Sequence, residues 1–253
     1  MYPVVFRIGD FDVTSFGVMV ALAAWAGLWL FRRELRRSGL SLDASDAGLV
    51  GVVGGLVGAK LLWTVEHATE APAVQLLFSR GGLSWYGGLI GGVGLGLAYI
   101  VFKRWPVVPI LAAATPALAF GHLIGRIGCF LVGDDYGTPS TLPWALPFPD
   151  GLPPTTVPVH PTQLYEAIGL GLLGGALIQW RRRGVPGATV LGRYLVSAGA
   201  LRFSVEFLRV NERVAFGLSV AHLVSLGAIA LGSMTLLFGA WTRRPVSSGS
   251  QPS

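Results

Sequence analysis

Residues 121–137, GHLIGRIGCFLVGDDYG, join a long apolar run to a polar loop, and residues 158–166, PVHPTQLYE, end that loop. Much of the remaining chain is built of Leu, Val, Ala and Gly, so ionisable side chains are few. Arg126 lies inside the apolar run. An arginine at membrane depth is energetically costly, and such a residue usually has a function. We therefore expect the chemistry of this protein near Arg126.

The composition indicates a membrane protein. Of the 253 residues, 52% are hydrophobic and 13% are charged, and the mean hydropathy is +0.61. Soluble domains contain about 25% charged residues. The single cysteine, Cys129, excludes an intramolecular disulfide framework. A net charge of +6 could indicate nucleic acid, but the basic residues flank apolar runs, as they do in membrane proteins, so we expect no nucleic-acid partner.

The apolar runs predict an all-α polytopic protein with seven transmembrane helices. A membrane span needs about 20 mostly apolar residues. The runs that qualify lie near 14–31, 46–65, 83–103, 106–131, 163–180, 188–208 and 215–241. A basic stretch, 32–37, follows the first run, which is the reverse of the order in a signal peptide. We therefore expect the first run to be a retained span.

The basic residues of the linkers predict the orientation. With the N-terminus outside, the inner linkers and the C-terminal end hold Arg32, Arg33, Arg36, Arg37, Lys103, Arg104, Arg181, Arg182, Arg183, Arg243 and Arg244. The outer segments then hold only Arg7, Arg80, Arg209 and Arg213. Cytoplasmic loops carry the excess of Lys and Arg. The bias predicts an outer N-terminus and a cytoplasmic C-terminus, which requires an odd number of spans.

The chain is predicted to be one integral membrane domain, 1–241, followed by a disordered cytoplasmic tail, 242–253. The longest linker, about 133–160, is rich in Pro, Gly and Asp and contains Trp144 and Phe148. Loops of this length are usually functional or disordered. Its aromatic residues favour a cap on the outer face at the membrane surface. Most of the 36 glycines are expected to allow close helix packing.

The sixth run carries an arginine and a glutamate that can pair. Arg202 and Glu206 are four residues apart, so they share one face of a helix. A structural ion pair that orients helices is the alternative to a functional role. Lys60 also lies within a run, and the sequence assigns it no partner.

The fifth run begins with a group of polar residues. Pro161 fits the first turn of a helix, which places His160 at its outer start. Gln163, Tyr165 and Glu166 then lie in its first two turns. Such a group suggests a site for a polar head group. The alternative is a set of hydrogen bonds that satisfies the start of the helix.

Arg126 is flanked by Gly125 and Gly128, which allow a ligand or a neighbouring backbone to come close. A guanidinium offers forked donors that match phosphate oxygens, so Arg126 is a candidate ligand for a phospholipid head group. Asp134 and Asp135 could instead be its partners in a structural role.

Four segments resemble motifs of the prolipoprotein diacylglyceryl transferase family, in the order of that family and over nearly the whole chain. They are LSWYGGLIGG at 83–92, GRIGCFLVGDDYG at 125–137, HPTQLYEA at 160–167 and LRFSVEFLR at 201–209. The resemblance implies that phosphatidylglycerol donates its diacylglyceryl group to the thiol of a prolipoprotein signal-peptide cysteine. Membrane lipids surround such an enzyme in the bacterial inner membrane, and we expect no metal and no other cofactor.

The resemblance also assigns roles to residues. Arg126 and Arg202 match functional arginines, which implies phosphate binding and stabilisation of the leaving group. Glu206 would orient Arg202. The other residues implied in the site are His160 and Tyr86 as catalytic candidates, with Gly125, Asp134, Gln163, Tyr165 and Glu166 in substrate binding.

The chain departs from the usual family pattern at several of these motifs. Tyr86 stands where the family usually has a catalytic histidine, and an unperturbed tyrosine titrates near 10 against about 6.5 for histidine. The other departures are Phe16, Cys129, Val132, Asp134, Ala198 and His222. Two alternatives therefore stay open. One is an enzyme for another acceptor or phospholipid, with His122 or His160 as base; the other is a non-catalytic phospholipid-binding protein.

Overall fold

The computed structural model describes residues 4–9, 11–79 and 81–241, so the tail predicted for 242–253 lies outside the described residues. The chain divides into two compact units. One contains residues 21–121, and the other contains residues 1–20 together with 122–253. Each unit is described here by itself.

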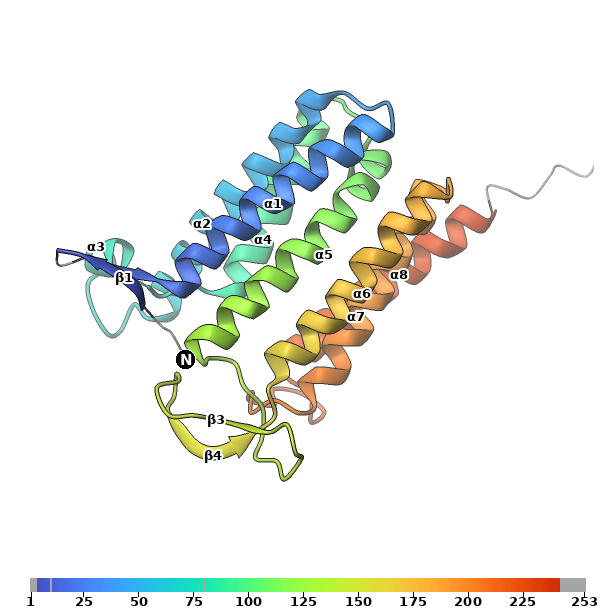
Figure 1. Ribbon diagram of the computed structural model, residues 1–253. Helices are drawn as coiled ribbons and strands as arrows, with labels where there is room; N and C mark the ends of the chain where they lie inside the picture. Colours follow the sequence, from blue (N-terminus) through green and yellow to red (C-terminus); the bar gives the residue numbers. More distant parts are fainter. Residues whose placement is uncertain (1–3, 10, 80, 242–253) are drawn as a thin grey trace, which may run out of the picture. The chain divides into compact units, whose positions relative to one another are not determined.

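Long helices form at all seven predicted runs, which confirms the all-helical class within the described residues (Figure 1). They are α1 (Ser15–Arg37), α2 (Ser45–Glu66), α4 (Trp85–Phe102), α5 (Val107–Val132), α6 (Thr162–Arg182), α7 (Gly187–Glu206) and α8 (Val220–Trp241). Five segments, 15–37, 42–66, 85–102, 107–132 and 220–239, are long and apolar enough to cross a membrane. The chain is therefore a multi-pass membrane protein. Helices α6 and α7 are not among these segments; α6 contains Glu166, Arg181 and Arg182, and α7 contains Arg193, Arg202 and Glu206.

Two helices differ in extent from the predicted apolar runs. Helix α1 continues through the basic stretch 32–37, because arginines in the last turn of a helix interact favourably with its dipole. Helix α8 begins at Val220 and not at 215. Residues 215–218 form a tight turn before α8. Phe216 and Gly217 have φ angles of 50° and 72°, and Leu218 N donates to Ala215 O at 2.7 Å.

In the unit of residues 21–121, α2 and α4 pack through their glycines, as the sequence predicts. A Cβ placed on Gly54 would lie 2.8 Å from the carbonyl oxygen of Gly91. Lys60 of α2 also finds its partners here, after the short helix α3 (Ala73–Phe78). Its Nζ donates to the carbonyl oxygens of Gly81 at 2.7 Å and Ser79 at 3.0 Å. Lys60 therefore holds the loop that leads into α4.

In the other unit, the loop between α5 and α6 folds over the start of α6 (Figure 1). It contains an antiparallel hairpin of β3 (Leu146–Phe148) and β4 (Thr155–Val159). Phe148 is 2% exposed and stacks on Tyr136 with ring centroids 5.4 Å apart. Phe148 thus forms a small core of the loop, whereas Trp144 is exposed. A second hairpin, β1 (Val4–Ile8) with β2 (Phe11–Thr14), precedes α1.

Candidate functional site

Arg126 lies near the end of α5 and is only 5% exposed. Its Nη1 donates to Asp135 Oδ2 at 2.8 Å, and its Nε forms an ion pair with Glu166 Oε2. Removing a guanidinium from water is costly unless carboxylates pair with it. The two carboxylates supply that pairing, and they come from the loop after α5 and from the start of α6.

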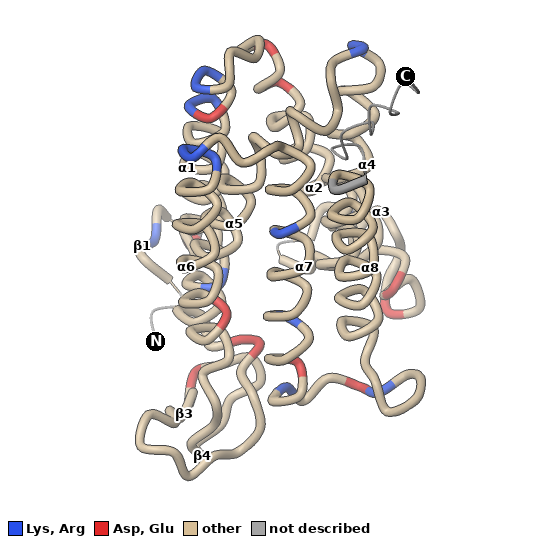
Figure 2. The backbone as a smooth tube through the Cα atoms, turned by 90° about the vertical axis from the view of Figure 1, so that its right-hand side faces the viewer, with Lys and Arg blue, Asp and Glu red and all other residues tan. Residues whose placement is uncertain are grey.

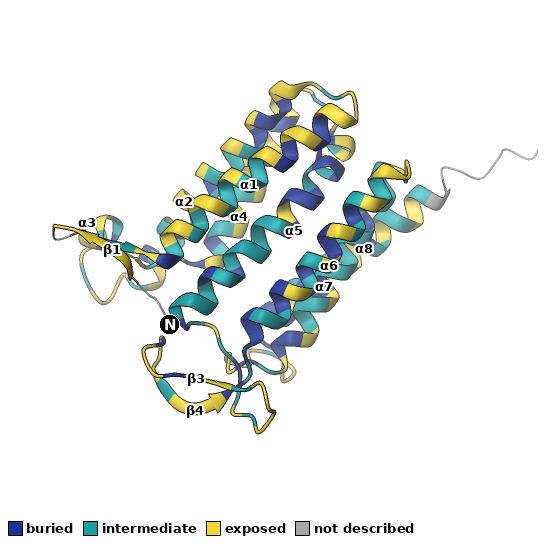
Figure 3. Ribbon diagram, viewed as in Figure 1, coloured by how far each residue is buried: buried dark blue, intermediate teal, exposed yellow. Residues whose placement is uncertain are grey.

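Glu166 joins Arg126 to the helix α7. It is 1% exposed, and its Oε1 accepts a hydrogen bond from Arg202 Nη1 at 2.8 Å. Arg202 Nη2 lies 2.7 Å from Glu206 Oε2, which is the pairing that the four-residue spacing predicts. Glu206 also accepts hydrogen bonds from Asn211 at 2.7 Å and Ser219 at 2.5 Å. Figure 3 shows the buried first turns of α6, where Glu166 lies.

A third arginine completes the group. Arg209, 6% exposed, follows α7 and forms an ion pair with Asp135 Oδ1. Asp135 therefore bridges Arg126 and Arg209 with its two oxygens. We call Arg126, Asp135, Glu166, Arg202, Glu206 and Arg209 the arginine–carboxylate cluster. Figure 2 shows charged segments of α6 and α7 toward the ends of these helices where the β3–β4 hairpin lies.

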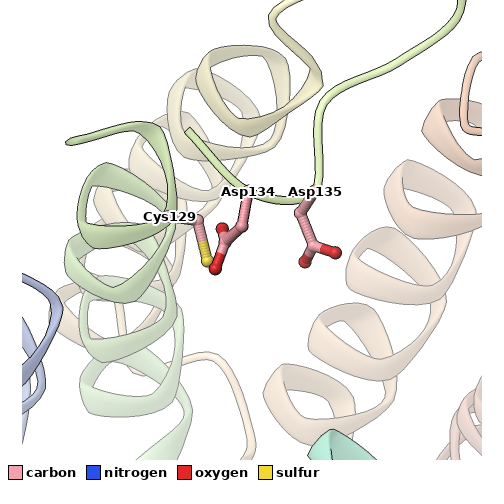
Figure 4. A group of neighbouring side chains, drawn as sticks. All are labelled: Cys129, Asp134 and Asp135. Carbon is pink, nitrogen blue, oxygen red and sulfur yellow. The ribbon is translucent and has the colours of Figure 1, made fainter. Parts of the chain in front are cut away.

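Asp134, the residue predicted to bind substrate, points elsewhere than Asp135. Figure 4 shows its carboxyl beside the Cys129 thiol, with which it forms a hydrogen bond, while the Asp135 carboxyl points away. The backbone oxygen of Asp134 accepts a hydrogen bond from Gln163 Nε2 at 2.5 Å. Among the described residues, Asp134 forms no ion pair with Arg126, so Asp135 is the aspartate partner of Arg126.

The two neighbouring aspartates have opposite pKa shifts. Burial of the carboxyl, together with the charge of Asp135, raises the pKa of Asp134. Burial also opposes ionisation of Asp135, but the charges and hydrogen bonds of Arg209 and Arg126 outweigh it and lower the pKa of Asp135.

Cys129, Asp134 and Asp135 bring three possible metal-ligand atoms within 4.8 Å of one another. Asp135 is already paired with Arg126 and Arg209. Both oxygens of Asp135 are thus engaged by guanidiniums, whose positive charge opposes the binding of a cation. Asp135 is therefore poorly placed to serve as a metal ligand.

The HPTQLYE segment forms the start of α6, and its polar residues have different partners. Gln163 is fully buried beside Asp134, and its Oε1 has no hydrogen-bond partner among the described residues. Tyr165 has its hydroxyl 2.7 Å from Trp144 Nε1 and 3.2 Å from His160 Nδ1. His160 and Tyr165 thus belong to a separate hydrogen-bonded group, which ties the loop between α5 and α6 to the start of α6.

Two further histidines are buried near the cluster. His122 lies one turn before Arg126 on α5, and its Nε2 is buried without a hydrogen-bond partner in the described part of the chain. His222 is fully buried against Phe203 and Phe207, and its Nδ1 accepts from the backbone N of Ser219 at 3.2 Å. His222 therefore fixes the loop between α7 and α8.

The remaining sequence-predicted residues take other places. Tyr86 lies in the first turn of α4, in the unit of residues 21–121. Gly125 has room beside it, because an added Cβ would meet no heavy atom of the described residues within 4 Å. Gly128 serves packing, since its added Cβ would lie 3.0 Å from Met19 Cβ and 3.4 Å from Phe16.

Sequence reasoning missed Arg209 and did not decide between the two aspartates. Arg209 was counted only among the outer charges, although it lies three residues after Glu206 at the end of the LRFSVEFLR segment. Its place in that segment is the signal that could have identified it. Asp135 has a φ angle of 62°, which turns its side chain toward the arginines, and no sequence pattern predicts that angle.

Comparisons with known proteins identify the family of this chain. A family model described as prolipoprotein diacylglyceryl transferase matches residues 3–238. Three similar proteins are named phosphatidylglycerol–prolipoprotein diacylglyceryl transferase. The protein from Clostridium tetani is 32% identical over 92% of this chain and 95% of its own length. The protein from Methylococcus capsulatus is 34% identical over 96% of this chain and 96% of its own length. The protein from Idiomarina loihiensis is 33% identical over 93% of this chain and 92% of its own length.

Proposed function

This chain belongs to the prolipoprotein diacylglyceryl transferase family, and we propose that it transfers the diacylglyceryl group of phosphatidylglycerol to the lipobox cysteine of a prolipoprotein. This transfer is the first step of bacterial lipoprotein maturation. The observation that carries the proposal is the pair of guanidiniums, Arg126 and Arg202, which one buried carboxylate, Glu166, holds together.

The arginine pair suits a phosphodiester. Arg126 comes from α5 and Arg202 from α7, so their donors converge on Glu166 from two directions. A phosphate group accepts such forked hydrogen bonds with several oxygens. Positive charge fixed before the reaction stabilises the charge that develops on the leaving phosphate. We assign Arg126 and Arg202 to phosphate binding and leaving-group stabilisation, with Glu206 holding Arg202.

The reaction needs a thiolate nucleophile. The sulfur forms a bond with the terminal glycerol carbon of the diacylglyceryl group, and the bond between that carbon and the phosphate oxygen breaks. The products are a thioether and glycerol phosphate. Tyr86 takes the position of the usual family histidine, and His160 is held by Tyr165. We propose Tyr86 and His160 as hydrogen-bond donors in catalysis. A tyrosine with an unperturbed pKa near 10 is protonated at neutral pH, so it can donate a hydrogen bond but is a poor general base.

The remaining residues of the site are assigned to substrate binding. Gln163, Tyr165, Asp134 and Gly125 are proposed to contact substrate. Gln163 supports this role with a buried amide oxygen that has no partner among the described residues, and Gly125 with the open space beside it.

We further propose that α6 and α7 also cross the membrane, which gives seven spans, an outer N-terminus and a cytoplasmic C-terminus in the bacterial inner membrane. Their charged residues support this, because Glu166, Arg202 and Glu206 pair within the protein. In this arrangement residues 1–241 form one membrane domain with a tail at 242–253, and the loop of 133–160 caps the outer face.

A transfer assay with two donors and two acceptors tests the function. Purified protein is mixed with vesicles of phosphatidylglycerol or phosphatidylethanolamine, and with a lipobox peptide or its Cys→Ser form. We expect lipidated peptide only with phosphatidylglycerol and the cysteine peptide. Lipidation from the other donor would instead favour an enzyme for another phospholipid. Binding of phosphatidylglycerol without any turnover would favour a non-catalytic lipid-binding protein.

A further inference from the structure

The Glu166 carboxylate occupies the position that suits a phosphate group best. Its Oε2 pairs with Arg126 Nε, and its Oε1 accepts from Arg202 Nη1 at 2.8 Å. A carboxylate and a phosphodiester each present two oxygens to forked guanidinium donors. A phosphodiester held by both arginines would therefore replace Glu166 between them.

The charges of the cluster point to the same exchange. Its three arginines and three carboxylates have formal charges that cancel. An incoming anion therefore finds no uncompensated cation unless a carboxylate gives up its partners. Asp135 keeps Arg209, and Glu206 keeps Asn211 and Ser219. Glu166 bonds to Arg126 and Arg202 alone among the described residues. Glu166 is thus the carboxylate that exchange would release.

His122 provides a place for the released carboxylate. It lies on the same face of α5 as Arg126, one turn earlier, so it is on the side of α5 where Arg126 pairs with Glu166. Its Nε2 is buried and has no hydrogen-bond partner in the described part of the chain. An N–H at that atom can donate to Glu166 after Glu166 has left the arginines.

We propose that phosphodiester binding frees Glu166 from Arg126 and Arg202, and that the freed carboxylate takes the proton of the acceptor thiol. This proposal rests on the proposed function. A buried carboxylate without its cations is a stronger base than one that is paired. The thiol proton passes to Glu166, and the sulfur electron pair forms the bond to the glycerol carbon. The electron pair of the broken carbon–oxygen bond stays on the phosphate, which Arg126 and Arg202 hold. Glu166 then returns its proton to solvent as glycerol phosphate leaves.

Glu166→Gln tests this role, measured with phosphatidylglycerol vesicles and a lipobox peptide. We expect kcat to fall about 100-fold or more at pH 7, since general-base catalysis contributes about that much. The KM for phosphatidylglycerol should not rise, because the glutamine competes less for the arginines. The deficit should shrink between about pH 7 and 9, where the acceptor thiol ionises without help.

The groups facing Glu166 define the control for this pH profile. They are His122 and Arg126 from α5, Arg202 and Glu206 from α7, and Asp135 from the following loop. His122 supplies the imidazole of this set, and its contribution must be separated from ionisation of the thiol. The alkaline recovery should therefore persist when His122→Gln is added to Glu166→Gln. Glu70→Gln removes an exposed glutamate of the other unit and should leave kcat and the profile unchanged.

Three results would overturn the proposal while leaving the proposed function intact, provided the wild-type protein transfers lipid. They are an unchanged kcat in Glu166→Gln, a raised KM without alkaline recovery, or a recovery lost with His122. An inactive wild-type protein would instead contradict the proposed function. If Glu166→Gln does not fold, Glu166→Asp carries the test. It keeps a carboxylate, so we expect a lower kcat with the wild-type pH profile, and a raised KM at unchanged kcat would overturn the proposal.

Discussion

Glu166 Oε1 lies 2.8 Å from Arg202 Nη1 although the two residues are 36 positions apart, and the second oxygen of the same carboxylate pairs with Arg126. One buried side chain therefore links α5, α6 and α7. Three unpaired arginines in an apolar setting would repel one another, and removing each charge from water would be costly. The carboxylates between them offset this charge and hold the three guanidiniums together.

Replacement of Arg126 by lysine should nearly abolish transfer. Lysine is a single ammonium group and cannot bond through separate nitrogens to both Glu166 and Asp135, as Arg126 does. We expect kcat/KM for diacylglyceryl transfer to fall about 100- to 1000-fold, the usual loss when a preorganised charge donor is removed.

Arg193→Lys is the matched control for this substitution. Arg193 lies outside the cluster, with its guanidinium carbon 4.7 Å from the Trp180 ring centroid, and a lysine can keep that contact. It should change transfer little. Nearly full transfer by Arg126→Lys would contradict the phosphate-binding role of the guanidinium.

Asp135→Asn should destabilise the unit that contains the cluster. Asparagine tolerates the positive φ of 62°, so the change mainly removes the charge between Arg126 and Arg209. The side chain of Asp135 is 43% exposed, so solvent screens part of the loss. We expect about 1–3 kcal/mol less stability, measured by unfolding in detergent at pH 7. Asp150→Asn, at an exposed position, should have no effect, and an equal effect of both would contradict the role of Asp135.

Asp134→Asn should not destabilise the protein at pH 7, and its effect on stability should depend on pH. Because the pKa of Asp134 is raised in the folded protein, its contribution to stability is present below about pH 4 and is lost as pH rises through the folded-state value. The variant should therefore be at least as stable as the wild type at pH 7, and its advantage should vanish toward pH 4. Thermal unfolding across this range measures it, and a variant less stable at pH 7 than at pH 4, relative to wild type, would refute it.

The pKa of Asp135 is lowered, so its contribution has the reverse dependence. It is present above about pH 4 and is lost as pH falls through the lower folded-state value. The stability difference between Asp135→Asn and the wild type should therefore close under acidic conditions. The same unfolding series tests both aspartates, and a deficit that persists unchanged in acid would argue for a role other than charge.

Gly54→Ala should weaken the packing of α2 against α4. The added Cβ would lie 2.8 Å from the Gly91 carbonyl oxygen, too close for the backbones to stay in place. We expect a loss of about 1–3 kcal/mol from this overpacking. The control is Gly94→Ala in α4. Its added Cβ meets no described heavy atom within 4 Å, so the change should be neutral or slightly stabilising. Equal thermal stability of the two variants in detergent would contradict the packing assignment.

Local patterns in the sequence predicted what local physics decides. The apolar runs predicted the long helices, and the spacing of Arg202 and Glu206 predicted their ion pair. The pairing of Glu166 with both arginines depends on how α5, α6 and α7 pack, and no periodicity encodes that. The choice of Asp135 over Asp134 depends on one backbone angle. The strands β3 and β4, LPF and TTVPV, are too short and too rich in proline to be recognised from alternation.

The most direct test of the central claim is the product balance of the wild-type protein. Purified protein is incubated at neutral pH with phosphatidylglycerol vesicles and a lipobox peptide, and both products are quantified by mass spectrometry. We predict that each diacylglyceryl-modified peptide, linked through a thioether to its cysteine, is matched by one released glycerol phosphate, and that Arg126→Ala yields neither. The assignment would be contradicted if the folded wild-type protein gave no modified peptide. It would also be contradicted if glycerol phosphate were released without modified peptide.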